Sequence, residues 1–191
     1  MIQKGIMISR LALGQFTPFL SLYWEDAEYE AVESWISGTD FPTVQDELHA
    51  ALQTELGQDW TIVMVNLGRS AIQLALECMQ LPTGSEVLLP SFVCTGVVMP
   101  IIQAGLTPVY VDVDEHFNIS FESVLEADSP NVRAIILCHL SGCWARDTDK
   151  IVEWARSRGI FVIDDAAQSQ GLEYEGRMAG TVGDVGIFSA H

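Results

Sequence analysis

The sequence predicts an α/β fold with a mostly parallel sheet flanked by helices. Short apolar runs alternate with helical stretches from about residue 58 onward, and this alternation is typical of βαβ units whose strands run parallel. The 191 residues are enough for one domain with a core of its own. Hydrophobic residues make up 49% of the chain and charged residues 18%, a composition that favours a buried sheet over disorder.

Two helices are predicted ahead of the alternating part. Apolar residues recur at roughly helical spacing over Asp26–Ile36 and over Thr43–Leu56. Gly38 follows the first stretch and Gly57 the second, and glycine commonly ends helices. We therefore expect an N-terminal helical segment, 1–57, followed by an α/β domain, 58–191.

The alternating part predicts six strands and the helices between them. The expected strands are Thr61–Val65, Val87–Leu89, Thr107–Val111, Val132–Cys138, Ile160–Ile163 and Val185–Ser189. The expected helices are Ser70–Met79, Cys94–Ala104 and Asp147–Arg158. Ligands of such sheets bind at the carboxyl ends of the strands, so we expect the functional residues there.

The stretch Val87–Val111 has no charged residue and is long enough to span a bilayer. Pro90, Pro100 and Pro108 interrupt it and divide it into strand, helix and strand. Strands buried on both faces of a parallel sheet are apolar throughout, so we interpret the stretch as part of the sheet. Residues 1–10 lack the pattern of a signal peptide, and we expect a cytoplasmic protein.

The net charge of −17, from 9 basic and 26 acidic residues, disfavours nucleic acid and anionic membranes as partners. An anionic ligand must then be held by local donors. None of the four cysteines forms a C-x-x-C pair, and no second cluster completes a tetrahedral metal site. We expect no metal, and ordinary buried thiols in a reducing compartment, at Cys78, Cys94, Cys138 and Cys143.

The segment Asn66–Ala71 joins a predicted strand to a predicted helix. Gly68 allows a tight turn there, so the amides of Arg69, Ser70 and Ala71 are expected to point outward at the helix N-terminus. Free amides and the helix dipole together bind anions, and the Ser70 hydroxyl adds a donor. A plain helix cap explains the same residues, and the motif is neither a P-loop nor a dinucleotide fingerprint.

Asp164 and Asp165 follow the predicted strand Ile160–Ile163. Alternation along a strand sends them to opposite faces, so one of them is expected to point into a cleft. A buried carboxylate needs a partner there, either a protonated ring nitrogen or a metal ion. The glycine-rich stretch Gly180–Gly186 leads to a last strand that ends at Ser189, which is either a phosphate donor or part of a tight turn.

In combination, six ordered segments resemble the DegT/DnrJ/EryC1/StrS family of sugar aminotransferases, within the fold-type-I enzymes that use pyridoxal 5'-phosphate (PLP). The resemblance extends from about Trp24 to His191, and such an enzyme's large domain is the implied fold. The segments are Asn66–Ile72, Gly84–Phe92, Ala104–Asp114, His139–Gly142, Ile163–Gln168 and Gly183–Ser189.

The resemblance implies a role for individual residues. Gly68, Arg69 and Ser70 would bind the PLP phosphate together with Ser189, and Asp165 would pair with the pyridine nitrogen. Two more residues complete the implied site: Gln168 would hydrogen-bond the phenolic oxygen of the ring, and Cys94, within Phe92–Thr95, would lie over the ring face. The family often has an aromatic residue at the position of Cys94 and usually Ser or Thr at that of Leu67.

The family's Schiff-base lysine lies a few residues beyond the position of Ser189. The lysines of this chain are Lys4 and Lys150, so we expect the catalytic lysine beyond His191 and interpret the chain as an N-terminal fragment that lacks the family's C-terminal small domain. A few relatives have histidine in place of the lysine and act as dehydratases. His191 is not at that position.

Two classes of function follow from the resemblance. The intact protein would be a PLP-dependent aminotransferase that moves an amino group, usually from glutamate, to a keto group of a nucleotide-linked sugar, as a homodimer. Alternatively, it is a non-catalytic PLP-binding or phosphate-binding member with a regulatory role, or a PLP-dependent sugar dehydratase. The fragment alone is expected to be inactive. A nicotinamide-dependent dehydrogenase is disfavoured because no predicted strand is followed by its glycine fingerprint.

Overall fold

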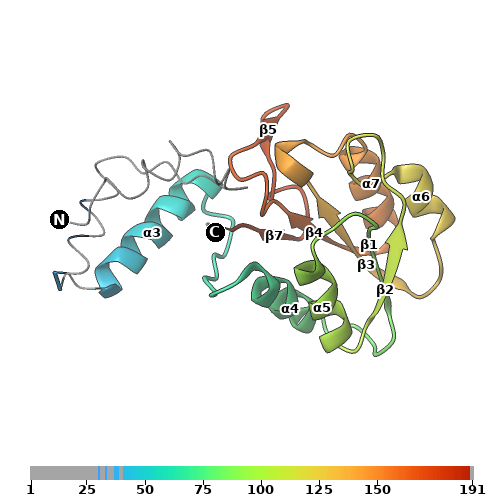
Figure 1. Cartoon of the computed structure of the whole chain (residues 1–191), viewed down its shortest axis with the longest axis horizontal. Helices are drawn as coiled ribbons and strands as arrows, with labels where there is room; N and C mark the ends of the chain where they lie inside the picture. The colour runs from blue at the N-terminus through green and yellow to red at the C-terminus, as the bar shows by residue number, and fades with distance from the viewer. Residues whose placement is uncertain (1–29, 31–32, 34–36, 39–40, 190–191) are drawn as a thin grey trace, which may run out of the picture. The chain divides into compact units, whose positions relative to one another are not determined.

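The structure is a computed structural model that describes residues 30, 33, 37–38 and 41–189. It divides into two units, Met1–Ile62 and Val63–His191 (Figure 1). In the first unit, helix α3 (Phe41–Leu56) confirms the predicted second helix. It ends at Gly57, which has a φ of +91° and donates its amide to the Gln53 carbonyl at 3.1 Å. Most of the predicted helix Asp26–Ile36 lies outside the described residues.

The second unit contains a five-stranded sheet in the order β2-β1-β3-β4-β7, in which every neighbouring pair is parallel. This confirms the predicted fold class and five of the six predicted strands, with ends that differ by up to two residues. The strands are β1 (Glu86–Pro90), β2 (Thr107–Val111), β3 (Val132–Cys138), β4 (Phe161–Asp165) and β7 (Val185–Ile187).

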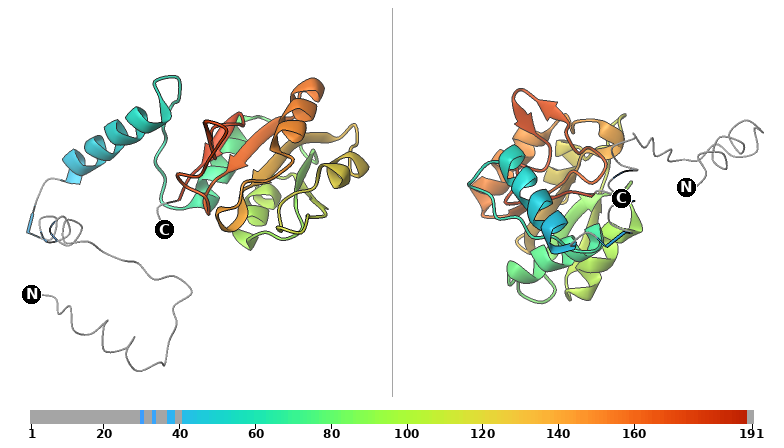
Figure 2. Two further views of the ribbon diagram at one scale, coloured as in Figure 1. Left: turned by 90° about the horizontal axis from the view of Figure 1, so that it is seen from above. Right: turned by 90° about the vertical axis from the view of Figure 1, so that its left-hand side faces the viewer.

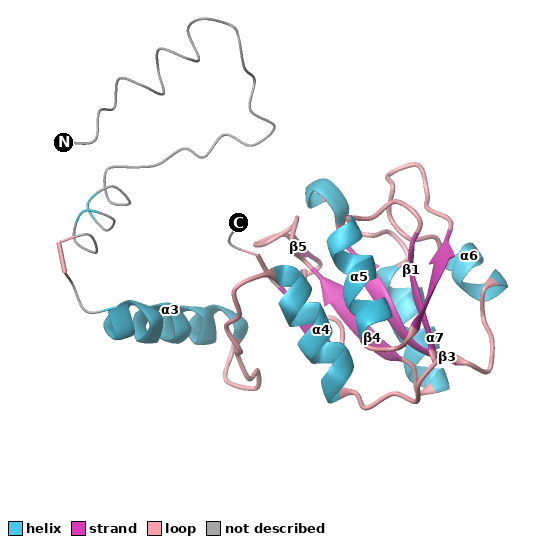
Figure 3. Cartoon of the chain, turned by 60° about the horizontal axis from the view of Figure 1, so that its bottom comes forward, coloured by secondary structure: helices cyan, strands magenta, loops and turns pink. Residues whose placement is uncertain are grey.

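Helices cover both faces of this sheet (Figures 2 and 3). The two core clusters place α4 (Gly68–Cys78) and α5 (Thr95–Gln103) on one face, and α6 (Phe121–Glu126) and α7 (Thr148–Arg158) on the other. Successive residues of a strand point to opposite faces. In the central strand β3, for example, Ile136 packs toward α4 and α5, whereas Ile135 and Leu137 pack toward α6 and α7.

One predicted strand is wrong. Thr61–Val65 is irregular backbone, and Val63 and Met64 have exposed fractions of 63% and 43%. A β-branched run becomes a strand only when a neighbouring strand satisfies its backbone groups. None of the strands in the described part of the chain pairs with this segment.

The uncharged stretch Val87–Val111 confirms the predicted division, because it forms β1, α5 and β2 in succession. Among the described residues, no helix is long and apolar enough to cross a membrane. The prediction of four buried thiols is wrong for three of them, because Cys78, Cys94 and Cys143 are exposed and only Cys138 is buried. Cys78 lies near the end of an amphipathic helix, and the other two lie in loops.

Three short elements were not predicted from the sequence. They are α6 with six residues, the 3₁₀ turn η1 (Leu140–Gly142), and the hairpin of β5 (Glu173–Tyr174) and β6 (Arg177–Met178). Elements of two to six residues are too short for a periodic pattern. Two of them, η1 and the hairpin, lie in the connections that follow β3 and β4, at the end of the sheet where ligands bind.

Candidate functional site

A cavity of about 240 Å³ lies at the carboxyl ends of β1, β3, β4 and β7 and at the first turns of α4 and α5. This is the position at which open parallel sheets bind ligands. Its walls include six of the seven residues to which the sequence assigned a cofactor role, all except Ser70. The lining residues used below are Gly68, Arg69, Cys94, Cys138, His139, Asp165, Gln168 and Ser189.

The first turn of α4 supplies Gly68 and Arg69 to the cavity. The sequence predicted free amides at Arg69, Ser70 and Ala71, but the amides of Ser70 and Ala71 donate to the Leu67 carbonyl at 2.9 and 3.1 Å. Leu67 is the N-cap residue and has extended backbone, so its carbonyl accepts the first bonds of the helix. Of the predicted amides, that of Arg69 therefore remains for an anion, together with the amide of Gly68, one residue before the predicted set.

Ser70 does not line the cavity. Its hydroxyl donates to Asn66 Oδ1 at 3.1 Å, on the approach to the helix. The sequence could not distinguish this contact from an anion contact, because a serine near a helix start serves either purpose.

The start of α5 supplies the facing wall. Cys94 is its N-cap residue, and its Sγ accepts the Gly96 amide at 3.4 Å. Of the predicted ring-covering segment Phe92–Thr95, Val93 and Cys94 line the cavity, but Phe92 and Thr95 do not. Phe92 instead packs against Phe117, with ring centroids 4.9 Å apart.

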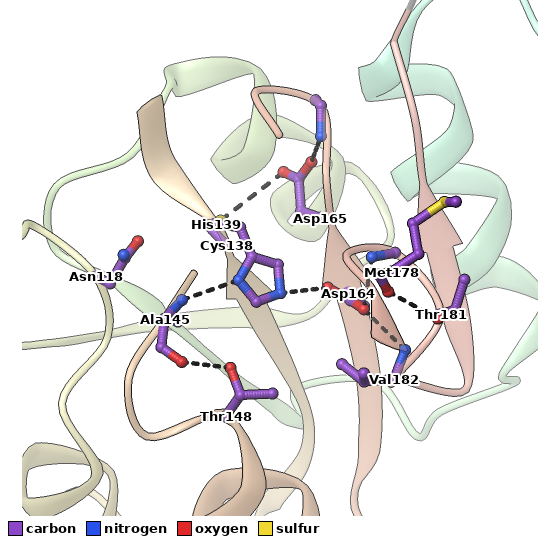
Figure 4. A network of polar contacts seen from close by, with 12 residues as sticks. Asn118, Cys138, His139, Ala145, Thr148, Asp164, Asp165, Met178, Thr181 and Val182 are labelled. Carbon is purple, nitrogen blue, oxygen red and sulfur yellow. Dashed lines mark hydrogen bonds and ion pairs between the residues drawn. The ribbon is translucent and has the colours of Figure 1, made fainter. Parts of the chain in front are cut away.

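Asp164 and Asp165 point to opposite faces of β4, as alternation predicts (Figure 4). Asp164 is fully buried, and its Oδ2 accepts the amides of Gly180 and Val182 at 2.8 and 3.0 Å. This carboxylate therefore holds the glycine-rich segment that leads to β7. Asp165 lies on the other face, at the end of the strand, and lines the cavity.

Asp165 has an exposed fraction of 8%. Its Oδ1 accepts the Ala167 amide at 3.0 Å, and its Oδ2 lies 3.8 Å from Cys138 Sγ. Burial raises the pKa of Asp165 above its usual value; the Ala167 amide opposes this effect and the neighbouring Asp164 charge adds to it. A carboxylate in such a place is stabilised by a cationic N–H of a ligand.

His139 lies at the end of β3 and has an exposed fraction of 1%. Its Nδ1 accepts the Ala145 amide at 3.0 Å, which leaves the ring proton on Nε2. Nε2 lies 3.0 Å from Asp164 Oδ1, but the two atoms are not aligned as a hydrogen bond. The ring also packs on Trp144, with centroids 4.6 Å apart. The sequence contained His139 within a family motif, but its place in the cavity wall was not predicted.

The loop after β3 is tied to two other parts of the site. The buried Asn118 donates to the Cys143 carbonyl at 3.1 Å and accepts the Leu140 amide at 2.9 Å. The Ser141 amide donates to Gln168 Oε1 at 3.0 Å. Since the oxygen of Gln168 is engaged by the loop, the amide nitrogen is the group that remains to donate to a ligand.

The glycines before β7 are required by close packing. A Cβ on Gly186 would lie 1.9 Å from the Gly180 carbonyl oxygen, and one on Gly183 would lie 2.6 Å from the Val162 carbonyl oxygen. Gly180 itself has a φ of +90° and faces the Phe188 ring. This packing brings the chain from Gly180 to Ser189 against β4, with Ser189 at the cavity.

The walls of the cavity thus combine three different groups. Amides at the start of α4 suit an anion, the buried carboxylate of Asp165 suits a protonated nitrogen, and the amide nitrogen of Gln168 suits an oxygen acceptor. Within the described part of the chain, no cluster of His, Cys, Asp or Glu could hold a metal ion. The metal alternative for Asp164 and Asp165 is therefore unsupported, because the two carboxylates point apart.

Comparisons with known proteins show the family to which the chain belongs. Residues 27–191 match the DegT/DnrJ/EryC1/StrS aminotransferase family. GDP-perosamine synthase of Escherichia coli O157:H7 is 34% identical over 175 residues, which are 88% of this chain and 46% of that protein. The UDP-N-acetyl-3-dehydro-α-D-glucosamine 3-aminotransferase of Acidithiobacillus ferrooxidans is 37% identical over 123 residues, 64% of this chain and 33% of that protein. The chain spans about half or less of the length of these relatives.

The fold matches a solved structure of E. coli GDP-4-keto-6-deoxy-D-mannose-3-dehydratase with bound hydrated PLP. The TM-score is 0.79 at 26% identity, over 92% of this chain and 47% of that one. This likeness confirms the fold-type-I large domain that the resemblance implied. The chain belongs to the DegT/DnrJ/EryC1/StrS aminotransferase family, whose cofactor is PLP.

Proposed function

We propose that the intact protein is an aminotransferase that uses PLP in this cavity to aminate a keto group of a nucleotide-linked sugar. The observation that carries the proposal is the position of Asp165, a buried carboxylate at the end of β4 in a cavity that also receives the first turn of α4. The names of the two relatives, a GDP-perosamine synthase and a UDP-sugar aminotransferase, support a nucleotide sugar as substrate.

The residues in the cavity wall fit PLP, which carries a phosphate, a ring nitrogen and a phenolic oxygen. Gly68, Arg69 and Ser189 would hold the phosphate, by amides at the start of α4 and by a hydroxyl. Ser70 joins them only if its hydroxyl exchanges its bond to Asn66. Bound PLP supplies the electron sink for carbanion chemistry next to an amino group.

The other residues orient the ring and set its charge. The carboxylate of Asp165 would accept a hydrogen bond from the protonated ring nitrogen and keep that nitrogen cationic. A buried carboxylate is stabilised most by a cationic partner. Gln168 would donate its amide hydrogens to the phenolic oxygen, since its own oxygen is engaged by Ser141. Cys94 would contact the ring face with a small sulfur group from the start of α5.

The remaining parts of the proposal come from the family. A lysine beyond His191 would provide the catalytic amine, glutamate would be the amino donor, and two copies of the protein would form a homodimer. In this proposal the N-terminal segment, 1–57, precedes the PLP-binding domain, 58–191, and a small domain follows.

A sugar dehydratase is the second candidate, because a 3-dehydratase gives a TM-score of 0.79 over 92% of the chain. The two candidates share the cofactor pocket and differ in the residue at the position of the catalytic lysine. An aminotransferase needs a lysine that exchanges protons at the substrate, whereas the family's dehydratases have histidine at that position.

The deciding experiment begins with the gene sequence after the codon for His191. A lysine a few residues on, together with glutamate-dependent amination of a nucleotide keto-sugar by the purified full-length protein, would support the aminotransferase. Histidine at that position, with loss of water from the sugar, would replace it with the dehydratase. PLP binding without either activity would leave the regulatory alternative.

A further inference from the structure

We propose that Cys138 is a positioning residue for Asp165, whose carboxylate it holds through a thiol hydrogen bond while leaving that carboxylate free to pair with the ring nitrogen of PLP. The inference rests on the proposed function of Asp165 and adds a residue to which the sequence motif gave no role. It starts from the sheet. Cys138 and Asp165 are register partners on the parallel strands β3 and β4, and partners in neighbouring strands project to the same face.

The geometry makes the thiol the donor. Cys138 Sγ lies 3.8 Å from Asp165 Oδ2, within hydrogen-bonding range for sulfur, and both side chains are buried (Figure 4). Burial raises the pKa of the Cys138 thiol far above its usual value, and the Asp165 carboxylate raises it further. The sulfur therefore keeps its proton at neutral pH and acts as a neutral S–H donor.

The two donors to Asp165 act on different oxygens. The Ala167 amide binds Oδ1 and the Cys138 thiol binds Oδ2. One contact on each oxygen fixes the rotation of the carboxylate about its last bond, while a second lone pair on each oxygen stays available. Because neither donor carries a charge, the negative charge of Asp165 is left to a cationic ligand.

The charged and titratable groups near Asp165 come from three elements. Asp164 precedes it on β4, and His139 and Cys138 lie at the end of β3. Arg69, at the start of α4, lines the same cavity. The Cys138 thiol acts on the Asp165 carboxylate through a hydrogen bond, and it can be altered without adding or removing a charge at neutral pH.

The choice of sulfur has a chemical consequence. A thiol is a weaker donor than a hydroxyl, so it orients the carboxylate and lowers its pKa only slightly against the effect of burial. A serine would lower that pKa more, and an alanine would not lower it at all. If Cys138 only filled space in the core, C138A and C138S would not shift the pKa of Asp165 in opposite directions, because both substitutions remove volume.

The test compares C138A, C138S and wild-type full-length protein, with C78S as a control because Cys78 is exposed at the end of α4, on the periphery of the unit. The titration of the Asp165 carboxyl carbon is followed by ¹³C NMR in the PLP-free protein, and the signal is assigned by its loss in D165N. PLP affinity is measured separately by equilibrium titration.

The proposal predicts opposite shifts. The midpoint of Asp165 should rise by roughly half to one pH unit in C138A and fall by a similar amount in C138S, as the loss or strengthening of one hydrogen bond implies. PLP affinity should fall roughly 3- to 10-fold in C138A and return to within about threefold of wild type in C138S. C78S should match wild type in both.

Equal midpoints in all four proteins, or shifts of the same sign in C138A and C138S, would overturn the proposal. If C138A fails to fold, the downward shift in C138S still decides it. A wild-type protein that does not bind PLP would overturn the proposed function itself, and the cofactor role of Cys138 with it. Failure of the proposed function can be told apart from failure of the Cys138 proposal, because the NMR titration uses PLP-free protein and does not depend on PLP binding.

Discussion

Asp164 and Asp165 are consecutive residues of β4, yet their carboxylates lie on opposite faces of the sheet and have different partners. Asp164 accepts two backbone amides from the segment before β7, whereas Asp165 lines the cavity and is bound by one amide and one thiol. We therefore expect Asp164 to act on stability and Asp165 on the ligand of the cavity. Substitutions at the two positions are expected to separate these effects.

Replacing Asp165 by Asn should change the pH dependence of the stability of the PLP-free protein. Burial raises the pKa of Asp165 above its usual 3.8, so between these two values the folded state binds more protons than the unfolded state. The free energy of unfolding then falls as pH rises through that window. D165N removes this slope and should be as stable as wild type or more stable at pH 7. Urea unfolding across pH checks it, and an unchanged slope in D165N would contradict it.

Replacing Asp164 by Ala should destabilise the fold by about 3 kcal/mol or more, because two amide donors lose their acceptor in the interior. Those donors are the amides of Gly180 and Val182. D149A is the matched control. Asp149 pairs with Arg177 at the surface, and loss of an exposed ion pair costs about 1 kcal/mol or less. Similar unfolding free energies for the two variants in urea would refute the structural role of Asp164.

Replacing Gly186 by Ala should prevent close packing of β7. The new Cβ would lie 1.9 Å from the Gly180 carbonyl oxygen, so the backbone must move. We expect a loss of about 3 kcal/mol or more, or failure to fold. G96A is a suitable control, because its Cβ would meet Cys94 Sγ at 3.5 Å, an ordinary contact, within helix α5. Thermal unfolding that ranks G96A at or below G186A would count against this account.

Asn118 should be needed for the loop after β3. Its side chain binds the Leu140 amide and the Cys143 carbonyl and is fully buried. N118A should cost about 2–4 kcal/mol, since both partners lose a hydrogen bond. N118D keeps an acceptor for the Leu140 amide and should retain more of the structure near pH 5 than N118A does. Amide hydrogen exchange of residues 140–145 measures this, and equal protection in wild type and N118A would contradict it.

The fold could be predicted from the sequence where strands are apolar throughout. β1 and β3 are buried between two layers of helices, so their sequences are mostly apolar and their positions are evident. Thr61–Val65 is also apolar, but it pairs with no strand among the described residues. The sequence of one segment does not show whether a partner strand lies beside it. The hairpin at Glu173–Met178 has two residues in each strand, too few for a pattern.

The site could be predicted only in part. Alternation along β4 predicted that one of Asp164 and Asp165 points into the cleft, and the family resemblance assigned that place to Asp165. Gly68 was expected between a strand and a helix, and the helix is present but the strand is not. The predicted set of free amides began one residue too late and wrongly included Ser70 and Ala71, because the sequence does not show that the Leu67 carbonyl accepts their amides. The contact of Cys138 with Asp165 depends on the register between β3 and β4, which neither strand's sequence contains.

The most direct test of the account is an equilibrium titration of the purified full-length protein with PLP, in wild type and D165N, followed by absorbance. If Asp165 pairs with the ring nitrogen in the cavity, wild type should bind one PLP per chain, and D165N should bind roughly 10- to 100-fold more weakly because a hydrogen bond to a charged group is lost. Equal affinity in the two proteins, or no binding by wild type, would contradict the account.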